Sequence, residues 1–287
     1  MKVGLSTYSL AHAIREGKMD VLGAIRWIAE NGGEQVELSP AGYSLTGNPE
    51  LIASVVREAA ACGIAISSYT IGANFIKPTE AEFRAEIQRI KGEVDIGGLL
   101  GVKRMRHDGG FRPAADSSVA NFEADLPRLI EACREVADHA AQYGITTSVE
   151  NHGFHLQNSE RVQRLVLGVD RPNFRTTLDV GNFLCADEDP LAAVINNLPF
   201  ASHVHFKDFY VRDQDPGEGW FRSRRGRYLR GAIVGQGDVP VGEIIGLIRK
   251  SGYDGFISIE FEGMEDCQKG SRIGMQNVRR LWDAVPM

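Results

Sequence analysis

The stretch ITTSVENH at residues 145–152 decides how the rest of the chain is interpreted. It begins as a β-strand and ends in polar residues that can bind or ionise. Side chains alternate between the two faces of a strand, so Ser148, Glu150 and His152 share one face while Val149 lies on the other. The stretch follows a long helical pattern and a glycine. It therefore predicts a strand that carries a carboxylate to one end of a sheet.

Strand-like and helix-like segments alternate on both sides of this stretch. Strands are expected over residues 2–8, 35–38, 64–69, 101–107, 145–150, 174–179, 202–206 and 256–261, and helices over 20–31, 49–61, 79–100, 119–143, 159–167, 190–197, 239–251 and 271–284. Such an alternation over about 250 residues is typical of a (β/α)₈ TIM barrel. The turn after the first strand lacks the G-x-G-x-x-G of a doubly wound sheet. Because no low-complexity linker interrupts the chain, we expect a single domain over residues 1–287.

Composition narrows the class of protein. Hydrophobic residues make up 43% and charged residues 24%, as in ordinary globular proteins. The formal charge of −6 argues against a surface that binds nucleic acid. The four cysteines lie far apart without a C-x-x-C pair, which is typical of reduced thiols in the cytoplasm. There is no signal-peptide pattern and no apolar run near the ~20 residues of a membrane span, so we expect a cytoplasmic protein without a membrane partner.

Four consecutive strands end in residues that commonly bind metals. Glu150, Asp179, His205 and Glu260 stand in SVENH, TLDVGN, HVHFKD and SIEFE, each where a strand meets a loop. Functional residues of TIM barrels lie at the carboxyl ends of the strands, so these four side chains can converge. Three carboxylates and one imidazole suit Mn²⁺, Mg²⁺ or Co²⁺, with Zn²⁺ as an alternative. A single acidic residue at a strand end is often just a solvated loop start, but four in succession favour a shared metal site.

The residues two positions before these strand ends support the same interpretation. Ser148, Thr177, His203 and Ser258 would point into the barrel beneath the four candidates. A barrel interior normally holds Val, Ile and Leu, so a polar layer is unusual there. Metal-binding carboxylates and imidazoles need hydrogen-bond partners that fix their orientation, and this layer can supply them.

These motifs resemble a known superfamily. VENH, LDVGN, HVHFKD, the G-Q-G-D-V turn at residues 235–239 and GYDGFISIEFE are similar to motifs of the xylose isomerase-like TIM barrels. They resemble most closely the sugar phosphate isomerase/epimerase branch, which includes ketose 3-epimerases, hydroxypyruvate isomerase and inosose-processing enzymes. The resemblance covers nearly the whole chain. It implies that Glu150, Asp179, His205 and Glu260 bind one divalent ion, foremost Mn²⁺, and that Glu150 and Glu260 move protons on opposite faces of the substrate.

The resemblance also suggests residues that bind the substrate, with two departures from the ketose epimerases. Those enzymes usually carry a histidine three residues after the aspartate ligand, where this chain has Asn182. Some members use an arginine just beyond the histidine ligand, for which Arg212 is the nearest candidate. Further candidates at strand ends are Glu37, His107, His152 and Lys207. Lys207 shares the inward face with His205, so it either anchors an anionic group or pairs with a ligand carboxylate.

The loop over residues 212–234 is long and rich in arginine and aromatic residues. Arginine suits phosphate or carboxylate, so the loop is interpreted as a lid over an anionic substrate, with a solvated loop or a subunit contact as the alternatives. It also contains Asp213-x-Asp215, which could mark a second metal site, although we expect one metal.

Together these patterns predict a metal-dependent sugar isomerase or epimerase. A ketose or related α-hydroxy ketone would lose its α-proton to a carboxylate and pass through an enediolate. The alternative is a dehydratase or lyase of a cyclic ketone such as an inosose. The expected partner is then a small carbohydrate substrate. Whether the chain forms a homo-oligomer, either a dimer or a tetramer, stays open. DNA-repair endonucleases of the superfamily need a three-zinc cluster and more histidines than the seven present here. The chain carries all four candidate ligands, which argues against a binding protein that keeps the barrel but has lost the metal site.

Overall fold

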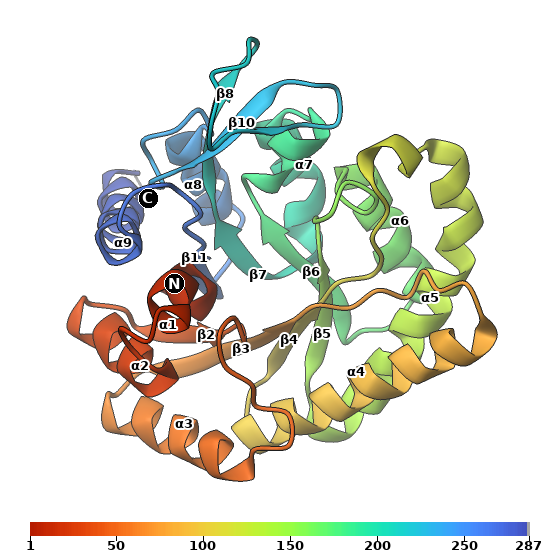
Figure 1. The fold of residues 1–287 in the computed structure, drawn as a ribbon, viewed down its shortest axis with the longest axis horizontal. Helices are drawn as coiled ribbons and strands as arrows, with labels where there is room; N and C mark the ends of the chain where they lie inside the picture. The colour runs from red at the N-terminus through yellow and green to blue at the C-terminus, as the bar shows by residue number, and fades with distance from the viewer. Residues whose placement is uncertain (286–287) are drawn as a thin grey trace.

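The computed structural model, which describes residues 1–285, contains a closed barrel of parallel strands. The strands are β1 (Lys2–Ser6), β2 (Gln35–Leu38), β3 (Ala65–Ile71), β4 (Arg104–His107), β5 (Thr146–Glu150), β6 (Phe174–Asp179), β7 (Ala201–Phe206) and β11 (Phe256–Ile259). Each pairs with its neighbour in the order β1-β11-β7-β6-β5-β4-β3-β2 (Figure 1). The predicted (β/α)₈ TIM barrel is confirmed.

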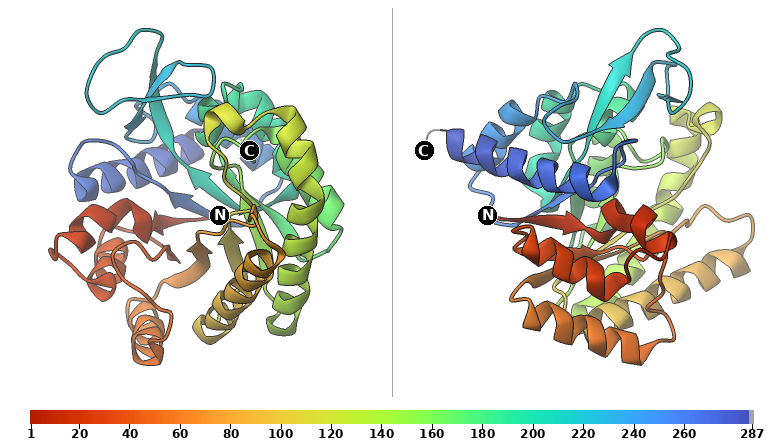
Figure 2. Two further views of the ribbon diagram at one scale, coloured as in Figure 1. Left: turned by 45° about the vertical axis from the view of Figure 1, so that its right-hand side comes forward. Right: turned by 60° about the vertical axis from the view of Figure 1, so that its left-hand side comes forward.

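Helices surround the barrel (Figures 1 and 2). They are α2 (Val21–Glu30), α3 (Pro49–Ala61), α4 (Glu80–Leu100), α5 (Val119–Ala140), α6 (Ser159–Val169), α7 (Pro190–Asn197), α8 (Val241–Lys250) and α9 (Cys267–Ala284). Several begin at a side chain that accepts a first-turn N–H. Thr79 does so in a capping box with Glu82, at the start predicted for α4. Within the described residues, no helix has the length and apolar character needed to cross a membrane.

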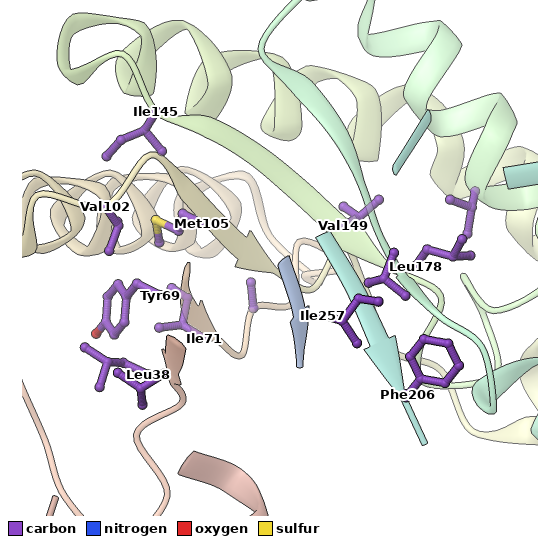
Figure 3. Packing of buried hydrophobic residues seen from close by; sticks show 14 of the residues in the cluster. Leu38, Tyr69, Ile71, Val102, Met105, Ile145, Val149, Leu178, Phe206 and Ile257 are labelled. Atoms are coloured by element: carbon purple, nitrogen blue, oxygen red, sulfur yellow. The ribbon is translucent and has the colours of Figure 1, made fainter. Parts of the chain in front are cut away.

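Apolar side chains fill the layer between the strands and the helices. Val149, Leu178, Phe206 and Ile257 point outward from adjacent strands and are fully buried (Figure 3). Burying one such side chain stabilises the fold by roughly 1.5–3 kcal/mol. The outward faces therefore hold the barrel to its helices, which leaves the inward faces free to be polar.

The inward layer beneath the strand ends is polar, as predicted. The Ser148 and Thr177 hydroxyl oxygens lie 2.8 Å apart. The Oγ of Ser258 lies 2.8 Å from the Nε2 of His203 and accepts a hydrogen bond of 3.0 Å from the Nε2 of Gln35. These side chains satisfy one another's hydrogen bonds inside the barrel. They support the next layer of residues toward the carboxyl-terminal ends of the strands, which we call the open end of the barrel.

Gly4 of β1 allows the closest backbone approach in this layer. A Cβ at this position would lie 1.9 Å from the carbonyl oxygen of Gln35. Gly4→Ala is therefore expected to lower the free energy of unfolding by about 3 kcal/mol, measured by urea denaturation. Gly92→Ala is the control, because a Cβ there meets nothing within 4 Å and alanine favours the helix by roughly 0.5–1 kcal/mol. Equal stability of the two variants would contradict this prediction.

A strand hairpin replaces the loop expected over residues 212–234. It consists of β8 (Asp208–Arg212), β9 (Phe221–Arg222) and β10 (Tyr228–Ala232), which pair antiparallel in the order β8-β10-β9. The guanidinium of Arg230 lies over the rings of Tyr210 and Trp220, 5.0 and 5.2 Å from their centroids. The hairpin projects beyond the barrel in each view (Figures 1 and 2). The prediction of a loop was wrong. The glycines and charged residues of this segment are typical of a loop, but stacking on aromatic rings across the strands stabilises it as strands.

The chain after β1 also forms structure that the sequence did not predict. A 3₁₀ turn over Thr7–Leu10 leads directly into a short helix, α1 (Ala11–Arg15). Both lie at the open end of the barrel, where Tyr8 and Arg15 line the cavity described below.

Candidate metal and substrate site

The four predicted metal-binding side chains converge at the open end of the barrel. Glu150, Asp179 and His205 stand at the ends of β5, β6 and β7, and Glu260 directly follows β11. One ligand atom from each lies within 4.8 Å of those from the others, and all four residues are buried. Strand alternation turns these side chains inward, and closure of the parallel barrel brings residues from positions 150 to 260 into one cluster.

The ring of His205 is oriented by Glu37 from β2. The Nε2 of His205 lies 2.8 Å from the Oε2 of Glu37. The Nδ1 has no hydrogen-bond partner and lies 3.6 Å from carboxylate oxygens of both Glu150 and Glu260. Burial alone would lower the pKa of His205, but the carboxylates of Glu37 and Glu260 outweigh burial and raise it. The ring therefore presents its Nδ1 to the carboxylate cluster.

Glu37 lies below the site and does not line the cavity that a substrate would enter, contrary to its selection as a substrate contact. It is fully buried and accepts a hydrogen bond from the hydroxyl of Thr70. Burial alone would raise the pKa of Glu37, yet His205 and His203 hold it well below its usual value. An ionised carboxylate behind an imidazole fixes the ring and strengthens it as a metal ligand.

Glu37→Gln is expected to weaken Mn²⁺ binding by about 10–100-fold, because an amide neither orients His205 as firmly nor makes it as basic. Isothermal titration calorimetry with Mn²⁺ measures this change. Glu93→Gln is the matched control, since Glu93 is also a buried glutamate but bonds the hydroxyl groups of Tyr69 and Thr46. If the two variants bind Mn²⁺ with the same affinity, Glu37 does not orient His205.

Two buried cations compensate the clustered carboxylates. Nη2 of Arg106, from β4, lies 2.8 Å from Oε2 of Glu150. Nζ of Lys207, which follows β7, lies 3.0 Å from Oε2 of Glu260 and 3.5 Å from Oδ2 of Asp179. Burial alone would raise the pKa of Glu150, but Arg106 and His205 hold it well below its usual value. Removing either cation would leave buried charge uncompensated.

Two asparagines fix the carboxylates at the strand ends. The Nδ2 of Asn182 donates a hydrogen bond of 2.9 Å to Oε1 of Glu150, and its Oδ1 accepts one of 3.4 Å from Lys207. The side chain of Asn151 bonds both the backbone N–H and the carbonyl of Asp179. Asn182, expected to touch substrate, bridges Glu150 and Lys207 and does not line the cavity described below. Asn151, for which the sequence suggested no role, joins β5 to β6.

The side chain of Asp179 leaves one oxygen without a hydrogen-bond partner, and Nζ of Lys207 lies 3.5 Å from that oxygen. Its Oδ1 accepts N–H groups of Gly181 and Asn182 at 2.8 Å, whereas Oδ2 has no hydrogen-bond partner. Burial raises the pKa of Asp179 to about 7. Two buried atoms without hydrogen-bond partners, Asp179 Oδ2 and His205 Nδ1, thus face a cluster of carboxylate oxygens. This donor set of three carboxylates and one imidazole fits a divalent cation.

A cavity of about 300 Å³ opens directly onto this cluster. Its volume lies at the lower end of the usual range for small-molecule sites. Polar and charged side chains dominate its wall: Tyr8, Arg15, Thr70, Arg106, Glu150, His152, Lys207, Glu260 and Glu262. His152 is half-exposed at the rim, and its Nδ1 lies 3.2 Å from Oδ1 of Asp108. The cavity places a small polar molecule against Glu150 and Glu260 at once.

His107, a candidate substrate contact, points away from this cavity. It is fully buried and packs against the rings of Phe75 and Phe174, with centroids 5.7 and 6.2 Å away. Burial lowers its pKa to about 4. The inward position on β4 belongs to Arg106, which sequence reasoning missed. The signal was the apolar Met105, since strand alternation then assigns Arg106 to the inward face and His107 to the outward one.

Arg212 also lies away from the candidate site. Its side chain is half-exposed, donates a hydrogen bond to the carbonyl of Val211 and lies 3.5 Å from Asp238. It stands at the end of β8 and does not line the cavity at the cluster. Arg212 lines a different cavity from the one at the cluster, so its contact with substrate stays a prediction.

The arginines of the hairpin engage neighbouring residues of the chain. Arg224 donates to Asn158 at 2.7 Å, and Arg227 lies 3.3 Å from Asp213. The cavity at the cluster is lined by none of the hairpin's arginines. Asp213 and Asp215 belong to neither of the two metal-ligand groups found among the described residues. An anion-binding lid over this cavity is thus not supported.

Comparisons with known proteins agree with this architecture. A family model described as xylose isomerase-like TIM barrel matches residues 25–281. Among curated proteins, an inosose dehydratase of Bacillus licheniformis is 27% identical over 143 residues, which is 49% of this chain and 48% of the relative. An inosose dehydratase of Lacticaseibacillus casei is 28% identical over 142 residues, 47% of this chain and 46% of the relative. The match thus spans about half the length of these curated relatives.

Solved structures share the fold at low identity. A probable 3-DHS dehydratase from Bacillus anthracis has a TM-score of 0.77 and 20% identity, covering 97% of this chain and 99% of the other. A D-psicose 3-epimerase from Clostridium cellulolyticum has a TM-score of 0.76 and 17% identity, covering 98% and 99%. A Mycobacterium smegmatis protein in complex with magnesium has a TM-score of 0.70 and 18% identity, covering 91% and 89%.

Proposed function

This chain belongs to the xylose isomerase-like TIM barrel family, and from that premise we propose that it is a metal-dependent enzyme acting on a polyhydroxylated ketone. The proposed reaction begins with removal of a proton from the carbon next to the carbonyl. One observation carries the proposal. Four buried ligand-type side chains from β5 to β11 converge, and Asp179 Oδ2 and His205 Nδ1 among them have no hydrogen-bond partner.

Glu150, Asp179, His205 and Glu260 would hold the cation, with Mn²⁺ as the proposed ion. When bound, a divalent cation supplies a Lewis acid that polarises a carbonyl and stabilises negative charge. The protein's own part is to arrange the proton carriers around the substrate. Arg106 keeps Glu150 ionised, and Lys207 holds Glu260 by one oxygen.

A carboxylate of this pair would accept the α-proton, and the electron pair of the broken C–H bond would move into an enediolate. A substrate in the cavity lies against Glu150 and Glu260 together, so one can accept a proton while the other returns one. The half-exposed His152 on the cavity wall can offer a hydrogen bond to a substrate hydroxyl group, and the amide of Asn182 holds Glu150 in position.

Loss of a β-hydroxyl from the enediolate would complete a dehydration, and we favour this outcome. The carboxyl group that has accepted the α-proton can give it to the departing hydroxyl group, which leaves as water, and the ammonium of Lys207 beside Glu260 can hydrogen-bond that hydroxyl group. The matched curated relatives are inosose dehydratases, which supports a cyclic polyhydroxylated ketone as substrate. Asn182 stands where ketose epimerases usually carry a histidine.

Epimerisation or isomerisation of a ketose is the second candidate. It is favoured by the pairing of Glu150 and Glu260 at one cavity, since two carboxylates can serve opposite faces of one carbon. No group then leaves, and the proton returns either to the same carbon or to its neighbour. The fold shared with a D-psicose 3-epimerase is compatible with this outcome.

The test uses Mn²⁺-loaded protein, inososes, 3-dehydroshikimate and a panel of ketoses in D₂O, followed by NMR. Dehydration appears as loss of the β-hydroxyl carbon signal and the appearance of an unsaturated product. Epimerisation or isomerisation appears as deuterium on an intact carbon skeleton. If none of these compounds gains deuterium or changes, the proposed reaction is contradicted.

A further inference from the structure

A further cavity lies at the amino-terminal ends of the barrel strands, opposite the metal-binding cluster. Its volume is about 410 Å³, within the usual range for small-molecule sites. Arg104, the first residue of β4, and Arg175, the second of β6, line it together with Lys103, which directly precedes β4. Gly255, directly before β11, also lies in its wall. We call this space the basal cavity.

The basal cavity is separate from the cavity at the metal-binding cluster. Strand alternation places Arg104 on the inward face of β4, two residues below Arg106. The guanidinium of Arg104 lies 5.1 Å from the centroid of the Phe256 ring, and the ring of His203 stacks on Phe256 with centroids 6.4 Å apart. Phe256 thus lies between the arginine and the polar layer of the barrel. The two cavities have no lining residue in common.

The cations of the basal cavity lack anionic partners. Among the described residues, Arg104, Arg175 and Lys103 form no ion pair, although Arg84 elsewhere contacts three carboxylates. Asp254 also lines the cavity, but the amino terminus already pairs with it at 3.0 Å. Three cations around one cavity repel one another unless an anion lies between them. The charge of the cavity therefore selects an anionic occupant.

The hydrogen-bond donors of the basal cavity are partly fixed in place. Nε of Arg104 donates a hydrogen bond of 2.8 Å to the carbonyl of Ser202, which leaves the two terminal amino groups without a partner among the described residues. Nζ of Lys103 donates one hydrogen bond of 3.3 Å, to the carbonyl of Tyr143, and keeps two N–H groups. The hydroxyl-bearing Thr146 also stands in the wall. A bound anion would thus meet donors that need little rearrangement.

We propose that the basal cavity binds a small tetrahedral oxyanion with the chemistry of phosphate. Arg104 and Arg175 hold it with their guanidinium groups, and Lys103 adds a third positive charge. Guanidinium groups match the geometry of phosphate oxygens and bind them with paired hydrogen bonds. A small anion fits better than a polyanion, since the formal charge of −6 on the whole chain would repel the latter. This inference does not rest on the proposed reaction.

The experiment titrates the full chain with inorganic phosphate in isothermal titration calorimetry at constant ionic strength, with and without added Mn²⁺. We expect saturable binding with a Kd below about 1 mM under both conditions. Arg175→Met should weaken it about tenfold or more, because a charge-assisted hydrogen bond is lost. Arg175 forms no side-chain hydrogen bond within the described residues, so this variant should fold normally. Lys103→Met should weaken binding in the same direction, and Arg175→Lys should retain more affinity than Arg175→Met.

Arg171→Met is the matched control. Arg171 precedes the same strand and is paired with Asp138, but it does not line the basal cavity. The variant removes the same charge from the chain and should bind phosphate as the unaltered protein does. No saturable binding up to about 10 mM phosphate would overturn the inference. So would binding that survives both Arg175→Met and Lys103→Met, or that requires Mn²⁺, because the anion would then lie elsewhere.

A parallel titration with glycerol 3-phosphate identifies the source of the anion. Tighter binding than inorganic phosphate, lost in Arg175→Met, supports the cavity as a site for the phosphate group of a larger molecule. Weaker binding, with inorganic phosphate still sensitive to Arg175→Met, supports a site for the free ion. Deuterium exchange into the substrate tests the proposed reaction independently of both results.

Discussion

Glu150→Gln and Glu260→Gln are each expected to lower solvent deuterium exchange into the substrate by about 10³-fold or more. Each removes a carboxylate that would exchange a proton with the substrate. Such a group typically raises the reaction rate by about 10²–10⁴-fold. Each also replaces a charged ligand with a neutral one. The measurement is the rate of deuterium incorporation in D₂O, followed by NMR with Mn²⁺ in excess.

Asp179→Asn separates the loss of a base from the loss of a metal ligand. Oδ2 of Asp179 faces the cluster without a hydrogen-bond partner, 3.5 Å from Nζ of Lys207, while Oδ1 is held by backbone N–H groups. Asp179→Asn should therefore weaken Mn²⁺ binding. Saturating Mn²⁺ should restore deuterium exchange into the substrate more fully in this variant than in either glutamine variant. Full exchange in both glutamine variants would rule out the proton-transfer roles of Glu150 and Glu260.

Arg106→Met is expected to lower the free energy of unfolding by about 3–5 kcal/mol at pH 7, the usual cost of breaking a buried ion pair. Arg106 is 8% exposed and contacts both Glu150 and Asp108. Without it, the buried carboxylate of Glu150 and the partly exposed carboxylate of Asp108 lose their shared cation. Urea denaturation measures the loss, and substrate turnover should fall with it because the charge of Glu150 is no longer compensated.

The pH dependence of this variant gives a second readout. In the native protein the pKa of Glu150 is depressed, so its stabilising contribution is present above the pKa of an unfolded glutamate and is lost as the pH falls. Without Arg106, burial favours the protonated form, and the folded protein then takes up a proton more readily. The stability deficit of Arg106→Met should therefore shrink as the pH falls from 7 toward about 4.

Arg84→Met provides the matched control for Arg106. Arg84 contacts three carboxylates, those of Glu80, Glu131 and Glu135, but its side chain is 46% exposed. Exposed ion pairs contribute roughly 0–1 kcal/mol, so this variant should lose little stability. Similar losses in the two variants would show that burial does not determine the importance of Arg106.

The barrel and the convergence of its four strand ends followed from local patterns. Strand alternation fixes which side chains point inward, and a closed parallel barrel gathers the carboxyl ends of its strands. Glu150 and Asp179 end β5 and β6 in both the prediction and the structure. Helix starts such as Thr79 could also be predicted from nearby residues alone, because a capping side chain acts within one turn.

The features that were missed depend on contacts distant in sequence. Glu37 and His205 are separated by 168 positions, so nothing near Glu37 indicates that it lies beneath an imidazole. The end of β4 at His107 was predicted correctly, but His107 was chosen over Arg106 because the inward side chain stands one residue before that end, and a shift of one residue reverses every side chain. The hairpin was missed because stacking across strands, as of Arg230 on Tyr210, forms only after the chain folds back.

The charged residues of the site come from both the N-terminal and the C-terminal part of the chain, and this affects how the barrel folds. All four candidate ligands lie on β5 to β11 or directly after, whereas Glu37 and Arg106 come from β2 and β4. Separate N- and C-terminal segments would thus each hold an incomplete set of charges, and only a closed barrel neutralises both. A cation that binds only the closed form would add about 2.7 kcal/mol to closure at a hundredfold excess over its dissociation constant. Metal concentration would then shift the equilibrium between the closed barrel and forms in which β1 and β11 are unpaired.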